Sequence, residues 1–118
     1  MDKRTLYALL LGDQYGMPPM RPLQGNERRP NPDGGYSTEI TMTDQDPQGQ
    51  WEVYPSLWMD QGQPVELPRD LAMQAANNYE RWGPQFPRFD DLDASERWAT
   101  ARSKGGGANI SPLARKSR

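Results

Sequence analysis

The sequence predicts a small α+β domain, a ββ(β)αα unit over residues 36–103, flanked by an extended N-terminal arm and a basic Gly-rich tail. Two observations carry this prediction. Alternating strand patterns precede two helical patterns, which is the order of an α+β unit. Of the 118 residues, only 34% are hydrophobic, while 11 are Gly and 12 are Pro. The chain therefore has room for one small core.

Before this unit we expect two segments. Thr5 is placed to cap a short apolar helix that ends at Gly12, so residues 1–11 are predicted to form a docking helix. Such a short helix needs a surface to pack on, either its own domain or a neighbour. Residues 12–35 hold five prolines after Gly16, which predicts a semi-rigid extended arm. Asp33-Gly34-Gly35 is a turn signal at its end.

Strands are predicted next. Residues 36–43 alternate, with Tyr36, Thr38, Ile40 and Met42 on one face. A polar loop follows, and residues 51–58 resume a strand pattern that Pro55 interrupts. After a turn at residues 60–62, residues 63–65 are predicted to form a short third strand.

Two helices complete the unit. The first follows Pro68 and ends at Gly83-Pro84, and its inner face is expected to carry Leu71, Ala75, Tyr79 and Trp82. The second is expected to have Asp93 as its N-cap, with Glu96 completing a capping box. It would end near Ser103, before three glycines, and bury Ala94, Trp98 and Ala101.

The composition excludes several chemistries. The chain has no Cys and no His, which excludes Ser-His-Asp and Cys-His catalysis within it, and we expect no metal or cofactor. The net charge of −2 conceals a basic tail over residues 104–118. This tail either is solvated or contacts an acidic protein surface or nucleic acid. No apolar run is long enough to span a membrane, so we expect no membrane span.

Three acidic or aromatic groups are candidate sites. Asp90, Asp91, Asp93 and Glu96 lie at a predicted helix start, where carboxylates are stabilised without any catalytic role. Asp44 and Asp46 lie in a polar loop that lacks the distal Glu of a calcium-binding loop. Among the tryptophans, Trp82 and Trp98 are expected on buried helix faces. Trp58 lies beside a turn and is the strongest candidate for an exposed aromatic platform.

Three motifs resemble a known family. They are NPDGGYST at residues 31–38, PSLW at residues 55–58 followed by Gly62, and FPRFDDLD at residues 86–93 followed by Ala99, Arg102 and Ser103. In this order they resemble a small module of tailed-phage and prophage virion structural and internal proteins, which is also appended to phage peptidoglycan hydrolases. The resemblance covers residues 28–103. Gly35 departs from it, because Ser is usual there. The resemblance implies that the protein is a virion component, and it assigns no catalytic residue to this chain.

The sequence therefore predicts a non-enzymatic structural protein of a tailed-bacteriophage virion, made in the bacterial host cytoplasm. We expect it in multiple symmetric copies, docked on portal, connector, capsid or tail proteins with its arm and tail draped over neighbours. An internal, ejected protein that contacts packaged DNA through phosphates is one option within this class. The alternative is an accessory binding module for a phage peptidoglycan hydrolase. The predicted partner-binding residues are Leu6, Leu9, Leu10, Arg21, Arg28, Arg29, Trp58, Lys104, Arg115, Lys116 and Arg118.

Overall fold

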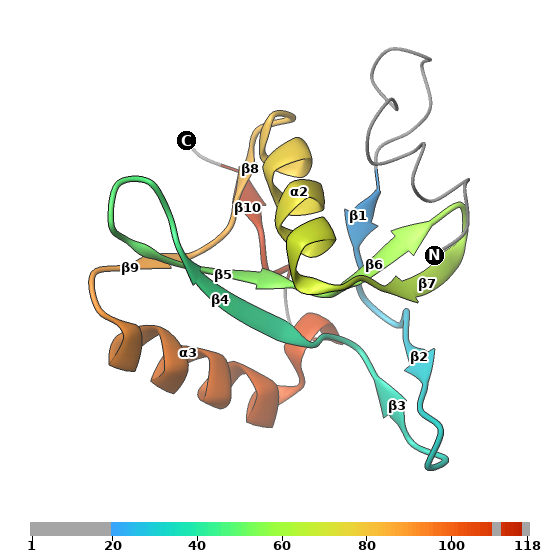
Figure 1. Ribbon diagram of the computed structural model, residues 1–118. Coiled ribbons are helices and arrows are strands. Elements are labelled where there is room, and N and C mark those ends of the chain that lie inside the picture. Colours follow the sequence, from blue (N-terminus) through green and yellow to red (C-terminus); the bar gives the residue numbers. More distant parts are fainter. Residues whose placement is uncertain (1–19, 110–111, 117–118) are drawn as a thin grey trace.

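The computed structural model describes residues 20–109 and 112–116 (Figure 1). These residues form small antiparallel sheets and two helices, which confirms the α+β class. The elements in chain order are β1 (Arg21–Pro22), β2 (Arg29–Pro30), β3 (Tyr36–Ser37), β4 (Thr41–Gln45), β5 (Trp51–Pro55), β6 (Leu57–Asp60), β7 (Gln63–Glu66), α2 (Arg69–Glu80), β8 (Pro84–Gln85), β9 (Arg88–Phe89), α3 (Leu92–Gly105), the 3-10 helix η1 (Gly107–Asn109) and β10 (Arg115–Lys116).

The central sheet has the strand order β4-β5-β9 and runs between α2 and α3 (Figure 1). Five residue pairs join β4 to β5, from Thr41↔Pro55 to Gln45↔Trp51. Glu52↔Arg88 is one of the two pairs that join β5 to β9. The register places Asp44 opposite Glu52, so both side chains lie on the same face of the sheet. Polar side chains of three strands are thereby gathered at one end of the sheet.

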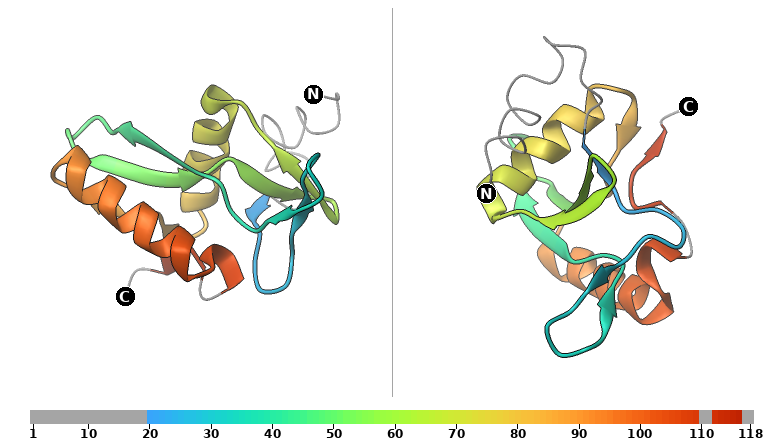
Figure 2. Two further views of the ribbon diagram at one scale, coloured as in Figure 1. Left: turned by 90° about the horizontal axis from the view of Figure 1, so that it is seen from below. Right: turned by 90° about the vertical axis from the view of Figure 1, so that its right-hand side faces the viewer.

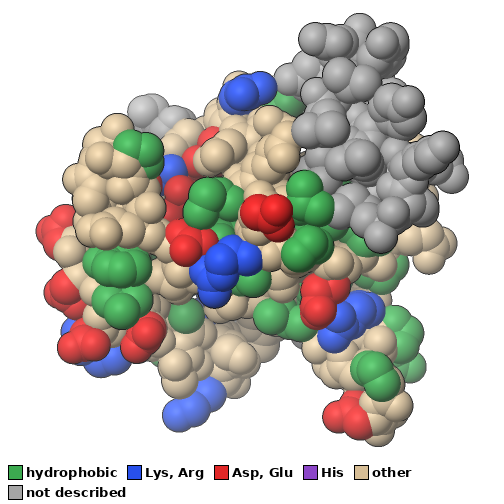
Figure 3. Space-filling model, in the orientation of Figure 1, with side chains coloured by type: hydrophobic (Ala, Val, Ile, Leu, Met, Phe, Trp, Pro, Cys, Tyr) green, Lys and Arg blue, Asp and Glu red, His purple; other side chains and the backbone are tan. Residues whose placement is uncertain are grey.

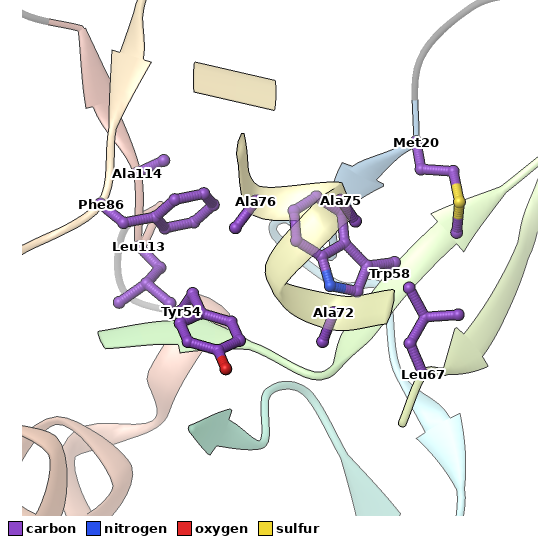
Figure 4. Packing of buried hydrophobic residues seen from close by; sticks show 10 residues of the cluster. All are labelled: Met20, Tyr54, Trp58, Leu67, Ala72, Ala75, Ala76, Phe86, Leu113 and Ala114. Carbon is purple, nitrogen blue, oxygen red and sulfur yellow. The ribbon is translucent and has the colours of Figure 1, made fainter. Parts of the chain in front are cut away.

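The chain leaves the central sheet at Pro55 and enters a second sheet, of order β1-β6-β7. Its strand β6 carries Trp58, which is fully buried. The Trp58 ring meets Tyr79 and Phe86 edge-on, with centroids 6.0 Å apart in each pair, and its Nε1 donates to the Pro55 carbonyl at 2.7 Å. Figure 4 shows the core around it. The prediction of an exposed Trp58 platform was therefore wrong, because the strand alternation turns this ring under α2.

The helices begin and end close to the predicted positions. Ala72, Ala75 and Ala76 form the buried face of α2. The helix ends at Glu80, two residues before Trp82, so Trp82 leaves the predicted inner face and is 59% exposed. The N-cap of α3 is Asp91 rather than the predicted Asp93, because the Asp91 carboxylate accepts from the Ala94 N–H at 2.7 Å.

The predicted extended arm and basic tail are the segments where the structure differs most from the prediction, because both contribute buried residues and paired strands. Met20 and Leu23 are buried, and β1 pairs with β6, so residues 20–35 belong to the fold rather than to a separate arm. At the other end Leu113 and Ala114 are buried, and β10 pairs with β8. Single apolar residues inside polar, Pro-rich segments complete the core. The predicted docking helix over residues 1–11 lies outside the described residues.

The β2–β3 hairpin projects from the body of the molecule (Figures 1 and 2). Its turn is closed by the Asn31 N–H, which donates to the Gly35 carbonyl at 2.6 Å. Gly34 has a φ of 97°, which an L side chain rarely adopts, and this confirms the predicted turn. In the part of the chain that the structure describes, no helix is both long and apolar enough to cross a bilayer.

Candidate functional site

One guanidinium ties three elements together at the end of the central sheet. Arg88 of β9 donates to Asp46 in the β4–β5 loop at 3.1 Å and to Glu52 of β5 at 3.0 Å. It also donates to both carboxylate oxygens of Glu80 on α2, at 2.9 Å each. Three neighbouring carboxylates hold the pKa of Arg88 above its ordinary value, mainly through the Glu80 hydrogen bonds. This cluster fixes α2 against the sheet.

Glu52 is the least satisfied member of the cluster. The residue is 7% exposed, and its Oε1 accepts from Arg88. Its Oε2 is buried and has no hydrogen-bond partner among the described residues. Burial and then the nearby charge of Glu80 raise the pKa of Glu52 to about 7, against the opposing effect of Arg88. Glu52 is therefore a buried carboxyl that exchanges its proton near neutral pH.

A second polar group lies beside it. The Tyr54 hydroxyl donates to Asp44, and Arg69 of α2 donates to the same carboxylate at 2.9 Å. Burial, assisted by the hydrogen bond to Asp44, raises the pKa of Tyr54 above its ordinary value. Arg69 also donates to the Thr43 carbonyl at 3.2 Å. Tyr54 thus stays protonated and fixes the position of Asp44.

These groups surround a recess of about 350 Å³ between the β4–β5 hairpin and α2. Figure 3 shows acidic and basic side chains meeting beside α2, where β4 passes it. Asp44, Asp46, Glu52 and Tyr54 line the recess, with Met73 and Asn77 of α2 on the far wall. Its lining offers acceptors for a cation together with an apolar surface.

The acidic residues that the sequence marks as candidate sites differ in how deeply their side chains are buried. Asp46 was expected in a solvated loop, but its side chain is almost fully buried and accepts from the N–H groups of Gln48 and Gln50, at 2.9 Å each. It closes the β4–β5 turn while binding Arg88. Asp93 and Glu96 lie exposed on α3. Within the described ranges, no three Asp or Glu side chains gather closely enough to hold a metal ion.

The predicted partner-binding residues are dispersed. Arg21 binds both carboxylate oxygens of Glu27, at 2.7 and 2.6 Å, and Arg29 binds Glu66 at 2.6 Å. Arg28 lies over the ring of Tyr36, with its guanidinium carbon 5.4 Å from the centroid. Lys104 and Arg115 are exposed. Leu6, Leu9, Leu10, Arg118 and the Lys116 side chain lie outside the described residues.

Sequence reasoning missed the role of Arg88. The only signal in the sequence is a charge between Phe86-Pro87 and Phe89, which would need carboxylate partners if these apolar neighbours were buried. The carboxylates that meet it come from residues 46, 52 and 80. The cross-strand register, which brings these carboxylates together, cannot be predicted from strand patterns alone.

Trp58 is buried, so the platform expected for a peptidoglycan-binding module is not at that residue.

Comparison with family models, with curated proteins and with solved structures finds no match.

Proposed function

We propose that the protein is a non-enzymatic structural component of a tailed-bacteriophage particle, docked in multiple copies on portal, connector, capsid or tail proteins. The observation that carries the docking role is the projecting β2–β3 hairpin (Figure 2). It presents Tyr36, which is 62% exposed, under the guanidinium of Arg28. Tyr and Arg are among the residue types that are enriched where proteins bind one another.

An ion pair and hydrogen bonds brace the hairpin within the chain itself. Arg29 at its base reaches Glu66 of β7 at 2.6 Å and Asn31 at 2.9 Å. The Ser37 hydroxyl donates to Asn31 at 2.9 Å and ties the two strands together. A preformed projection loses little conformational entropy on binding. This supports a docking element rather than a loop that closes over a substrate.

The motifs that resemble the virion module occupy structural positions. The first forms the β2–β3 turn, and the second forms the corner between β5 and β6. The third contains Arg88 of the carboxylate cluster, the Asp91 cap of α3 and Arg102. Residues that fix turns, caps and ion pairs maintain the fold, as expected if the three motifs belong to a structural module.

Quantitative mass spectrometry of purified particles tests the proposal. Particles that lack the native protein are complemented with the wild type, with Tyr36→Ala, or with Trp82→Ala as a matched control at another exposed aromatic. We expect the wild type and Trp82→Ala at one symmetric copy number, and Tyr36→Ala at a several-fold lower one. Loss of the protein after DNA ejection would identify the internal, ejected option. Its absence from particles would overturn the virion assignment.

A further inference from the structure

We propose that the strand edge formed by residues 36–41, beside the end of α3, binds an extended segment of a partner protein as an added strand. This goes beyond the virion assignment and does not depend on it. A groove of about 580 Å³ borders this edge. Residues 36–41 line one side of the groove, and the other side is formed by Ala99, Ser103, Gly106 and Gly107. Figure 3 shows the surface indented between the end of α3 and the β2–β3 hairpin.

The backbone of β3 forms ladder bonds on one side only. The Asn31 N–H donates to the Gly35 carbonyl at 2.6 Å, so position 35 bonds toward β2. Two places further along, Ser37 pairs with Arg29. Because hydrogen-bonded positions alternate in an antiparallel ladder, the N–H and C=O of Tyr36 point away from β2. The end of α3 lies on the side of β3 that is opposite β2 (Figure 1).

The same edge stays unpaired into the start of β4. The Ile40 carbonyl accepts from the Ser56 N–H at 2.7 Å, so position 40 bonds toward the neighbouring strands β5 and β6. Thr41 is one place along and therefore directs its N–H and C=O outward. The Thr43 carbonyl shows the same direction, because it accepts from Arg69 of α2 at 3.2 Å. That bond occupies the edge at Thr43 and leaves residues 36–41 as the unpaired stretch.

The two walls of the groove are fixed to each other. The Thr38 hydroxyl donates to the Gly106 carbonyl at 3.3 Å, and Glu39 binds Arg102 through both carboxylate oxygens. A Cβ added at Gly107 would lie 3.1 Å from the Thr38 Oγ1, so the strand passes the end of α3 at close range. A groove that is braced in this way loses little conformational entropy when a segment binds.

Unpaired strand edges bind other chains as added strands, in which main-chain hydrogen bonds supply affinity and side-chain pockets supply selectivity. Of the described residues that line the groove, Glu39 alone carries a charge, and Arg102 neutralises it. A charged side chain that entered the groove would lose its hydration without gaining a partner. Ala99 and Ser103 leave room for small side chains. The bound strand therefore carries small, uncharged residues at the alternate positions that face α3.

One end of the edge carries a cation. The Arg28 guanidinium lies 5.4 Å from the ring centroid of Tyr36 and donates to the Asn26 carbonyl at 3.3 Å. In the part of the chain that the structure describes, no carboxylate pairs with Arg28. A carboxylate of the partner at this end would be attracted to it. If the segment runs antiparallel to residues 36–41, as the described strand pairs do, its acidic residues follow its small residues.

The first experiment adds a peptide of this pattern to the ¹⁵N-labelled full chain. The probe is acetyl-Thr-Val-Ser-Val-Ser-Ala-Asp-Asp-amide, at neutral pH. We expect saturable shifts centred on the backbone amides of residues 36–41, and slower hydrogen exchange at the Tyr36 and Thr41 N–H groups. Shifts that do not saturate, or that are centred on another part of the chain, would overturn the proposal.

N-methylated peptides test whether the main chain of the segment is recognised. Two versions of the probe carry N-methyl groups on alternate residues, one version at odd positions and the other at even positions. One set of methyl groups replaces the N–H groups that face the free edge, and we expect it to weaken binding about tenfold. The other set replaces N–H groups that point away from the edge and should weaken binding less. Equal affinities of the two peptides would exclude strand addition.

Variants of the chain locate the site. Ser103→Phe adds a ring at an exposed position of the groove wall and should abolish saturable binding. Thr100→Phe is the matched control, because it adds the same ring on the outer side of α3 and should bind like the wild type. Thr41→Pro removes an outward N–H and gives a second test should Ser103→Phe not fold. If Ser103→Phe and Thr41→Pro both bind like the wild type, the groove is not the site.

The acidic end of the segment has a test of its own. We expect Arg28→Gln to weaken the probe several-fold and to leave unchanged the affinity of a version that ends in Ser-Ser. Thermal denaturation of Arg28→Gln checks that the substitution leaves the fold intact. Equal losses of affinity for the two peptides would overturn the assignment of a carboxylate beside Arg28.

Discussion

Glu39 and Arg102, which are 63 residues apart in the chain, form a two-bonded ion pair in which both side chains are only 8% exposed. The Arg102 Nε donates to one carboxylate oxygen of Glu39 at 2.7 Å, and its Nη2 donates to the other at 2.9 Å. The same guanidinium lies 5.8 Å from the ring centroid of Trp98. The pair therefore fastens the approach to β4 onto the last turn of α3.

Breaking this pair from one side should be costly. Glu39→Gln removes the carboxylate charge that both N–H groups of this buried guanidinium bind, and we expect a loss of about 3 kcal/mol of unfolding free energy. Glu66→Gln is the matched control, because its carboxylate pairs with Arg29 at the surface and should cost less than about 1 kcal/mol. Urea denaturation measures both. Equal losses of unfolding free energy from the two substitutions would show that the buried ion pair stabilises the fold no more than the surface pair does.

Glu52 should make the stability fall as the pH rises. Its folded pKa is about 7, above the ordinary value of 4.5, so between these values the folded state holds a proton that the unfolded state has lost. The stabilisation is complete below pH 4.5 and is lost as the pH passes 7. A pKa that is higher by about 2.5 corresponds to about 3.5 kcal/mol, and solvent screening of a group that is not completely enclosed lowers the effect to on the order of 2 kcal/mol.

Glu52→Gln tests this sign. We expect the variant to be more stable than the wild type at pH 8 and to lose most of the slope between pH 5 and pH 8. Denaturant midpoints at four pH values measure it, and Glu96→Gln provides the control for removal of an exposed charge. A wild-type stability that rises over this range would contradict the assignment.

Residues 112–116 should contribute to stability as well as to contacts. Leu113 is buried against the core that contains Phe86, so Leu113→Ala should cost about 2–5 kcal/mol. Lys104→Ala, at an exposed position of α3, is the control and should change the thermal midpoint little. Calorimetry of the two variants separates these effects. A Leu113→Ala protein with the wild-type midpoint would mean that the segment is only loosely attached.

Two tryptophans offer a matched pair. Trp58→Ala empties the centre of the core and should cost about 3–5 kcal/mol, whereas Trp82→Ala removes an exposed ring and should stay within about 0.5 kcal/mol. Chemical denaturation followed by circular dichroism measures both. Comparable losses from the two substitutions would contradict the buried position of Trp58.

Local patterns predicted the elements that local rules control. Pro55 ended a strand, and Gly34 marked the β2–β3 turn, because each imposes its backbone geometry without help from the rest of the chain. Helical spacing predicted the inner face of α2 in part, because Ala75 is buried and Leu71 and Tyr79 pack against the core, whereas Trp82 is exposed. These parts of the fold could be predicted before any tertiary contact was known.

The candidate site could not be predicted in the same way. Asp44 and Glu52 meet only because β4 and β5 pair in one register, and Arg88 joins them from a third strand. Met20 and Leu23 were assigned to the arm because their neighbours are Pro and Arg, although the buried area of two side chains outweighs that composition. In both cases long-range contacts decided the result.

The pairing of β1 with β6 and of β10 with β8 also bears on how fast the chain folds. Arg21 faces Met59 across one ladder, and Arg115 faces Gln85 across the other, so each junction closes a loop of some thirty or more residues. The entropy of closing such loops has to be lost before the contacts can compensate for it. Chains with many distant contacts fold more slowly than helical bundles of similar size. Loop closure, rather than helix formation, should therefore limit the folding rate of this protein.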